Sequence, residues 1–98
     1  MSNERFTYRG PAVIGGVPFR YVRFEEPTDG EKYLRSWTAA ASFRAEHAPS
    51  GFPGNLPPGG PYRVELPDGR QGDVLVRDVA FNGGAWDVHM EGTGPAPA

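Results

Sequence analysis

Residues 62–94 constrain the fold of this chain most strongly, because three strand-like runs alternate there with two turn signals. The first turn signal is Leu-Pro-Asp-Gly-Arg at 66–70, and the second is Asn-Gly-Gly at 82–84. Both join runs that are rich in β-branched and aromatic residues, a composition that favours strands. The stretch therefore predicts two consecutive antiparallel hairpins that share their middle strand.

The first of these hairpins could adopt either of two registers. A two-residue turn would set Val64 opposite Asp73, which mixes apolar and charged side chains on one face. A three-residue turn sets Val64 opposite Gly72, and it sets Arg63 opposite Asp73, so that opposite charges meet. We predict the three-residue turn, because a slip of one residue would turn the apolar side chains towards water.

The shared middle strand contains a conflict of phase. Val74 and Val76 fall on even positions, whereas Val79 and Phe81 fall on odd positions. A single alternating strand cannot place both pairs on one face. We predict a β-bulge at residues 77–78, which would reset the alternation by one residue. A strand that is buried on both faces is the alternative.

Residues upstream of 62 show further strand patterns. Residues 6–8 and 12–14 are short runs, and the Gly-Pro pair at 10–11 is expected to end or bend the chain between them. Residues 32–45 form the longest run. Its alanines are compatible with a helix, but its alternation and its Trp, Thr and Phe residues favour a strand.

Residues 17–25 also alternate, and both of their faces are partly apolar, which suits a curved and closed sheet. Strict alternation would give faces of Phe19, Tyr21 and Arg23 and of Arg20, Val22 and Phe24.

A long segment at residues 47–61 is dominated by proline and glycine and is not expected to form a regular element. An irregular segment of this length is unusual in a compact domain and is often functional. Phe52 and Leu56 are its only large apolar side chains, and we expect them to fix the loop to the domain. Two interpretations stay open: a strap over one end of the sheet, or a loop in which Phe52 and Leu56 contact a protein partner.

The overall pattern predicts a single all-β domain over residues 1–94, followed by a flexible tail at 95–98. A chain of 98 residues is long enough for one modest core. About six short antiparallel strands would form a small barrel or, alternatively, a two-layer β-sandwich. We favour the barrel, because closure removes exposed strand edges.

The composition argues against several classes of protein. The chain has no cysteine, which excludes a disulfide framework and a Cys-ligated metal and fits a cytoplasmic location. No apolar run approaches the roughly 20 residues that span a bilayer, and the first residues lack the apolar core of a signal peptide, so we expect no membrane association. The net charge of -2 argues against nucleic-acid binding.

The sequence also lacks the motifs of several catalytic and cofactor sites. There is no Gly-x-Ser-x-Gly nucleophile elbow and no phosphate-binding loop, so we assign no catalytic residue and no cofactor. Asp78, Asp87, His89 and Glu91 could share one face of the last hairpin. One histidine with flexible carboxylates is a poor ligand set, so we predict no metal.

Arginines are interleaved with aromatic residues in the two upstream runs, and on a curved sheet such side chains can hold an anionic ligand or stack on bases. The ligand-binding candidates are Arg20, Arg23, Tyr33, Arg35 and Trp37. The alternative is that the arginines are the solvent-facing side chains of amphipathic strands.

Four landmarks follow one another along the chain: Tyr-Arg-Gly-Pro-Ala at 8–12, Glu-Pro-Thr-Asp-Gly at 26–30 with Tyr33 and Trp37, the turn at 66–70, and Gly-Thr-Gly-Pro at 92–95. In these the chain resembles a group of short, uncharacterised β-domains of actinobacteria. Some of those domains stand alone and others are fused to flavin-dependent monooxygenases. The resemblance spans most of the chain except residues 47–61. It implies an accessory or binding role and no catalytic residues.

The sequence therefore leads to two functional hypotheses. The first is a non-catalytic β-barrel module that binds a protein partner or its own copies, because the domain is small and has a long apolar-tipped loop. The second is a small-molecule carrier, or an accessory or cyclase-like protein of a biosynthetic pathway, with a pocket at the barrel mouth.

Overall fold

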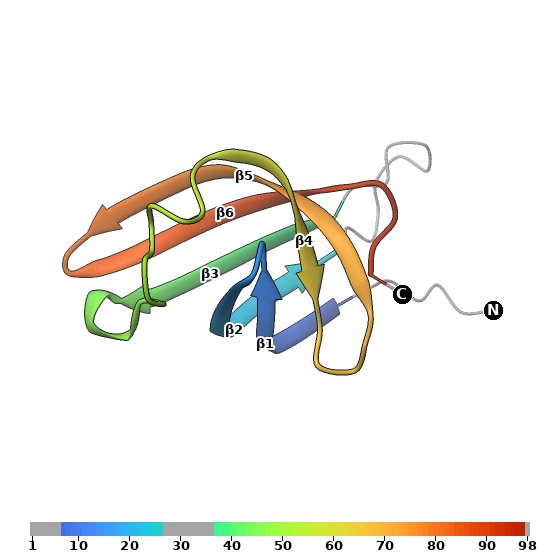
Figure 1. The fold of residues 1–98 in the computed structure, drawn as a ribbon, viewed down its shortest axis with the longest axis horizontal. Coiled ribbons are helices and arrows are strands. Elements are labelled where there is room, and N and C mark those ends of the chain that lie inside the picture. Colours follow the sequence, from blue (N-terminus) through green and yellow to red (C-terminus); the bar gives the residue numbers. More distant parts are fainter. Residues whose placement is uncertain (1–6, 27–36, 98) are drawn as a thin grey trace.

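The structure is a computed structural model that describes residues 7–26 and 37–97. These residues form a closed antiparallel β-barrel of six strands in the order β1–β2–β3–β6–β5–β4 (Figure 1). The barrel rather than the sandwich is therefore confirmed. Its elements are β1 (Thr7–Ile14), β2 (Val17–Glu25), β3 (Thr38–Arg44), the 3₁₀ turn η2 (Ala45–His47), β4 (Gly59–Glu65), β5 (Gln71–Asn82) and β6 (Ala85–Thr93).

Two three-stranded meanders, β1–β2–β3 and β4–β5–β6, make up the barrel. Along one seam β3 pairs with β6 over the whole length of β3. Along the other seam β1 and β4 share only the pairs Val13–Glu65 and Ile14–Val64. Residues 48–58 cross the face of the barrel between the end of η2 and the start of β4 (Figure 1).

The two tightest hairpins turn on Gly-Gly pairs. Gly15 and Gly16 have φ values of 59° and 83°, and the Gly-Gly pair at 83–84 has φ values of 60° and 82°. Two-residue hairpin turns of this type need positive φ at both positions, which glycine adopts at the lowest cost. The turn predicted at residues 82–84 is confirmed, and it sets Phe81 opposite Trp86.

The predicted register of the β4–β5 hairpin is also confirmed. Val64 lies opposite Gly72, and Arg63 lies opposite Asp73 with 3.1 Å between Arg63 Nε and Asp73 Oδ1. In β5 the pairing with β6 shifts between Val76 and residue 78, which confirms the bulge at residues 77–78. The shift lets the apolar residues on both sides of the bulge face the same way.

The first two strands differ from the sequence-based expectation. β1 runs without a break through Gly10 and Pro11, because Pro11 lies opposite the two residues Arg20 and Tyr21 of β2 in a β-bulge. A proline cannot donate to the strand ladder, and a bulge accommodates it without losing the strand. The predicted faces of β2 are therefore wrong beyond the bulge: Phe19, Val22 and Phe24 are buried, whereas Arg20, Tyr21 and Arg23 are exposed.

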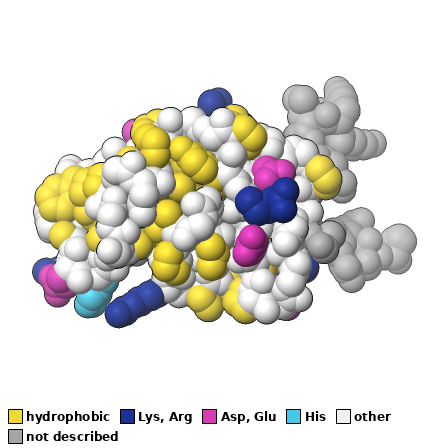
Figure 2. Space-filling model, viewed as in Figure 1, with side chains coloured by type: hydrophobic (Ala, Val, Ile, Leu, Met, Phe, Trp, Pro, Cys, Tyr) yellow, Lys and Arg dark blue, Asp and Glu magenta, His cyan; other side chains and the backbone are white. Residues whose placement is uncertain are grey.

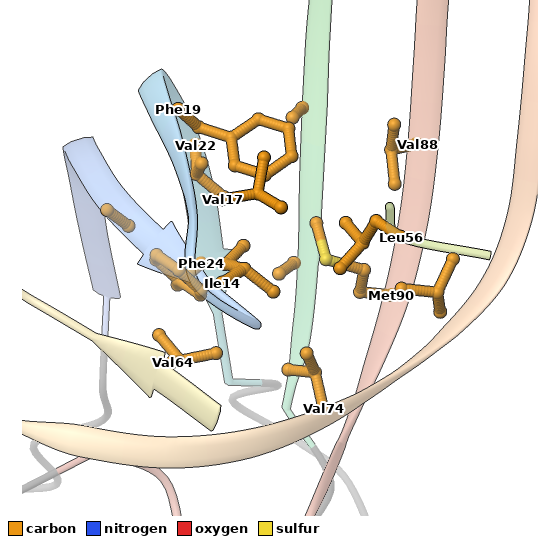
Figure 3. Packing of buried hydrophobic residues seen from close by; sticks show 14 of the residues in the cluster. Ile14, Val17, Phe19, Val22, Phe24, Leu56, Val64, Val74, Val88 and Met90 are labelled. Atoms are coloured by element: carbon orange, nitrogen blue, oxygen red, sulfur yellow. The ribbon is translucent and has the colours of Figure 1, made fainter. Parts of the chain in front are cut away.

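Apolar side chains from all six strands, together with Trp37, Leu56 and Leu66 outside them, fill the barrel (Figure 3). Full burial of a large aliphatic or aromatic side chain contributes about 1.5–3 kcal/mol relative to leaving it exposed. The largest fully buried side chains are Trp37, Phe24, Ile14, Leu56, Val22, Val64, Val74, Val76 and Val88.

The C-terminal segment lies against the barrel and does not form the free tail that we expected from its composition. Ala96 packs against the core, and Pro97 is buried. Pro97 lies so close to β5 that a Cβ atom on Gly72 would be 3.0 Å from its Cγ. The absence of a side chain at Gly72 thus makes room for this segment.

Candidate binding groove

The strands β2 and β3 pair along only part of their length. Their ladder contains Arg23–Ala40, Phe24–Ala39 and Glu25–Thr38. On its other edge β2 stays paired with β1 as far as Val17, and β3 stays paired with β6 as far as Arg44. In the part of the chain that the structure describes, the facing edges of residues 17–22 and 41–44 therefore have no partner strand.

Two local features accompany the separation of β2 from β3. The bulge at Arg20 and Tyr21 lies where the ladder stops, and bulges bend a strand and increase its twist. Aromatic rings also occupy the space beside this opening. The ring centroids of Phe19 and Phe43 are 5.8 Å apart, and those of Phe43 and Phe52 are 5.3 Å apart.

The separation leaves an open groove of about 740 Å³ on the side of the barrel. Apolar side chains and proline rings dominate its lining, with cationic side chains among them. The lining residues are Pro11, Pro18, Phe19, Arg20, Tyr21, Ser42, Phe43, Arg44, His47, Ala48 and Pro49.

An aromatic cluster continues from the groove to the β5–β6 turn. Phe52 stacks edge-to-face on Trp86 with 5.3 Å between the ring centroids, and Trp86 lies 4.7 Å from Phe81. Phe81 keeps 51% of its surface exposed. Figure 2 shows hydrophobic side chains gathered at the end of the molecule where Figure 1 places this turn. Apolar surface of this kind is typical of interaction sites.

Three arginines that form no ion pair with any described carboxylate lie on the outer face of β1 and β2. Among the seven arginines that the structure describes, four form ion pairs: Arg44 with Glu46, Arg63 with Asp73, Arg70 with Asp68 and Arg77 with Glu91. Arg9, Arg20 and Arg23 form no ion pair with a described residue, and all three are exposed. Glu25 is the one exposed carboxylate that the structure describes on β1 and β2, so this part of an acidic chain has a local excess of positive charge.

The structure separates the predicted ligand-binding residues. Arg20 lines the groove, and Arg23 lies on the outer face at the end of the β2–β3 ladder. The prediction that Trp37 binds a ligand is corrected, because its side chain is 1% exposed inside the core. Its Nε1 donates a hydrogen bond to the carbonyl of Gly94. Tyr33 and Arg35 lie outside the described residues.

Phe52 and Leu56 were the two candidates for partner contact in the segment at 47–61, and one of them is a core residue. Leu56 is fully buried, so its side chain holds the loop against the barrel, as we expected for a strap, and the alternative that Leu56 contacts a partner is corrected. Phe52 is half-buried and contributes to the aromatic cluster beside the groove. The irregular segment is also shorter than expected, because Gly59 pairs with Val76 and already belongs to β4.

Several groove residues were not among the sequence-based candidates. Phe43 belongs to the run at 32–45, which we predicted to be a strand, and strict alternation put Tyr21 on one face of β2 with Phe19 and Arg23. Arg44 and His47 stand where β3 leads into η2. A phase conflict between Phe19 and Val22, of the kind that revealed the bulge in β5, could have exposed the bulge in β2.

Two of the four polar side chains that we predicted to share a face of the last hairpin have a polar partner among the described residues. Glu91 pairs with Arg77 at 3.0 Å, and Asp87 accepts a hydrogen bond from the hydroxyl of Ser42. His89 lies opposite Asp78. Among the described residues no group of three His, Asp or Glu side chains could hold a metal ion.

Comparisons of the chain with protein-family models, with curated proteins and with solved structures found no match. Within residues 7–26 and 37–97, no helix is long and apolar enough to cross a membrane. The groove between β2 and β3 is therefore the feature on which a functional proposal has to rest.

Proposed function

We propose that this protein is a non-catalytic binding module that holds a segment of a protein partner in the groove between β2 and β3. The observation that carries the proposal is the pair of unpartnered strand edges that face each other across an aromatic-lined opening. Unpaired strand edges are templates for pairing with another chain. Proteins that recognise extended peptides use such edges together with pockets for alternate side chains.

The side chains around the groove support binding rather than catalysis. Ser42 donates its hydroxyl hydrogen to the carboxylate of Asp87 on β6, which is a much weaker base than the imidazole that usually activates a serine nucleophile. Aromatic and arginine side chains are the residues that contribute most to protein interfaces, and both types line this groove.

A small anionic molecule is the second candidate for the groove. Its volume of about 740 Å³ lies within the range of roughly 300–1,000 Å³ that is typical of small-ligand sites. Arg20 and Arg44 would then bind the anion. In this candidate function the ligand pocket of the carrier or accessory protein is the groove on the side of the barrel. It is not the barrel mouth, because side chains fill the barrel interior.

Tyr21 and Phe81 provide a matched pair of positions for testing the proposal. Their exposed fractions are 49% and 51%, and only Tyr21 lines the groove. A photo-reactive benzoyl-phenylalanine would replace each in turn in the native host, and cross-linked products would be identified by mass spectrometry. We expect position 21 to cross-link to a specific second protein and position 81 to give little of that product.

Three other outcomes would contradict the proposal. Cross-linking of the partner through position 81 alone would move the interface to the β5–β6 turn. Cross-links between copies of this chain would indicate self-association. A small molecule retained by the intact protein in native mass spectrometry, with no protein adduct at position 21, would favour the second candidate.

A further inference from the structure

The chemistry of the groove and its surroundings restricts what kind of segment can bind, provided that the proposed binding function holds. Two features are independent of each other: the backbone edges at the opening that pair with no described strand, and the arginines on the adjoining outer face that form no ion pair with a described residue.

The free edges favour an occupant with its own extended backbone. Residues 17–22 and 41–44 present peptide groups towards the opening without a partner strand among the described residues. A bound strand supplies one N–H and one C=O per residue at the spacing of a strand ladder, which a compact ligand cannot do. An added strand would also cover edges that isolated proteins usually protect.

The arginines favour an occupant that carries negative charge. Arg9 and Arg23 lie directly opposite each other in the β1–β2 ladder, and like charges in that relationship are destabilising. Arg20 is nearby on the exposed side of the bulge. Because none of the three has a carboxylate partner in the described chain, carboxylates from outside would relieve the repulsion.

The alternation of a strand connects these two features. Successive side chains of an added strand point to opposite faces of the sheet. Those on the outer face would lie on the side of Arg20 and Arg23, while those on the inner face would point towards the rings of Phe19, Phe43 and Phe52. The site would thus bind a segment in which acidic and apolar side chains alternate.

We propose that the occupant is an extended acidic peptide segment that adds a strand in the opening between β2 and β3, with Asp or Glu alternating with apolar residues. The arginines of the outer face bind its carboxylates, and the aromatic groove receives its apolar side chains.

A random octapeptide library displayed on phage and selected on the immobilised protein provides the test. We expect enrichment of Asp or Glu at alternate positions with apolar residues between them. Selected peptides would then be synthesised, and their dissociation constants measured by fluorescence polarisation against the full chain and its charge-reversal variants. The double variant Arg20→Glu, Arg23→Glu is expected to weaken binding at least about tenfold, because each outer carboxylate then meets a negative charge.

Two controls are needed. The first shows whether a lost affinity comes from charge at the groove or from damage to the fold, and the second shows whether the peptide binds through its backbone as well as its side chains. Arg77→Glu makes the same kind of charge reversal at an exposed position away from the groove, and it is expected to change the dissociation constant less than about twofold. A version of the peptide that is N-methylated at alternate residues keeps every side chain but loses backbone donors. It is expected to bind at least about tenfold more weakly in each of its two phases of methylation, because one phase removes the donors that face β2 and the other removes those that face β3.

The remaining outcomes distinguish this inference from the proposed function. Selection of groove-binding peptides without acidic residues would overturn the inference and leave the binding function intact. Acidic peptides whose affinity does not change on N-methylation in either phase would also overturn it, because strand addition would be absent. Failure to select any peptide, together with binding of inorganic phosphate or a single-stranded oligonucleotide by Arg20 and Arg23, would overturn both.

Discussion

The indole ring of Trp37 lies directly on the backbone of Gly92, so closely that a Cβ atom at residue 92 would overlap the ring. The two residues are also joined by a hydrogen bond of 2.7 Å from the N–H of Gly92 to the carbonyl of Trp37. Nε1 of the indole donates to the carbonyl of Gly94 at 3.2 Å. Trp37 is thus packed in the core against the backbone of β6, and its packing requires glycine at position 92.

Gly92→Ala is expected to destabilise the fold, because the added methyl group cannot fit beside the rigid indole. Overpacking of a core typically costs about 1–3 kcal/mol, and a clash this direct should reach at least the upper part of that range. Urea denaturation followed by tryptophan fluorescence measures the change in the free energy of unfolding.

Gly54→Ala is the matched control for that variant. The φ of Gly54 lies outside the left-handed region, and a Cβ there would make an ordinary contact at 3.6 Å with the carbonyl oxygen of Gly51. The control should therefore change the free energy of unfolding by less than about 1 kcal/mol. Equal effects of the two variants would contradict the packing of Trp37 on Gly92.

Leu56 lies in the irregular segment, but it behaves as a core residue in the structure. It is fully buried, and Leu56→Ala is expected to lower the free energy of unfolding by about 2–5 kcal/mol, because it leaves a cavity. Leu75→Ala makes the same chemical change at a half-buried position of β5 and should cost clearly less. Urea denaturation of both variants checks the prediction, and equal losses would show that the segment at 48–58 is not fixed through Leu56.

Asp68 has a lowered pKa in the turn between β4 and β5. The backbone N–H of Arg70 donates to its carboxylate, and this hydrogen bond is the main cause of the shift below the ordinary value of 3.8. The guanidinium of Arg70 adds a second contact at 2.8 Å. Because the folded pKa is below the unfolded pKa, the contribution of Asp68 to stability is present above pH 3.8 and is lost as the pH falls through the folded pKa.

A titration followed by the ¹³C chemical shift of the Asp68 carboxyl carbon tests the cause of this shift. Arg70→Gln keeps the backbone N–H that donates to Asp68, so most of the lowering of the pKa is expected to remain. A return of the Asp68 pKa to its ordinary value in that variant would assign the shift to the guanidinium instead.

Turn chemistry made much of the C-terminal half predictable from sequence. Pro-Asp-Gly and Gly-Gly turns have few compatible geometries, and the pairing of Arg63 with Asp73 selected one register. The conflict between Val76 and Val79 located the bulge in β5. An equivalent conflict between Phe19 and Val22 was explained by two partly apolar faces, and so the bulge in β2 was missed.

The groove itself could not be predicted from the sequence in the same way. It lies where the ladder between β2 and β3 stops, beside the bulge opposite Pro11 and beside rings from three separate segments. Leu56 and Trp37 were assigned to sites because aromatic and apolar residues serve both cores and interfaces. Only their burial in the folded chain distinguishes the two roles.

Amide hydrogen exchange measured by NMR, on the free protein and on its complex with a selected peptide, tests the central claim most directly. In residues 20–22 and 42–44, we predict that the amides pointing into the opening exchange rapidly in the free protein and at least about tenfold more slowly in the complex. The amides of β3 that pair with β6 should be slow in both states and serve as an internal reference. Protection of the opening in the free protein, or no added protection in the complex, would contradict strand addition between β2 and β3.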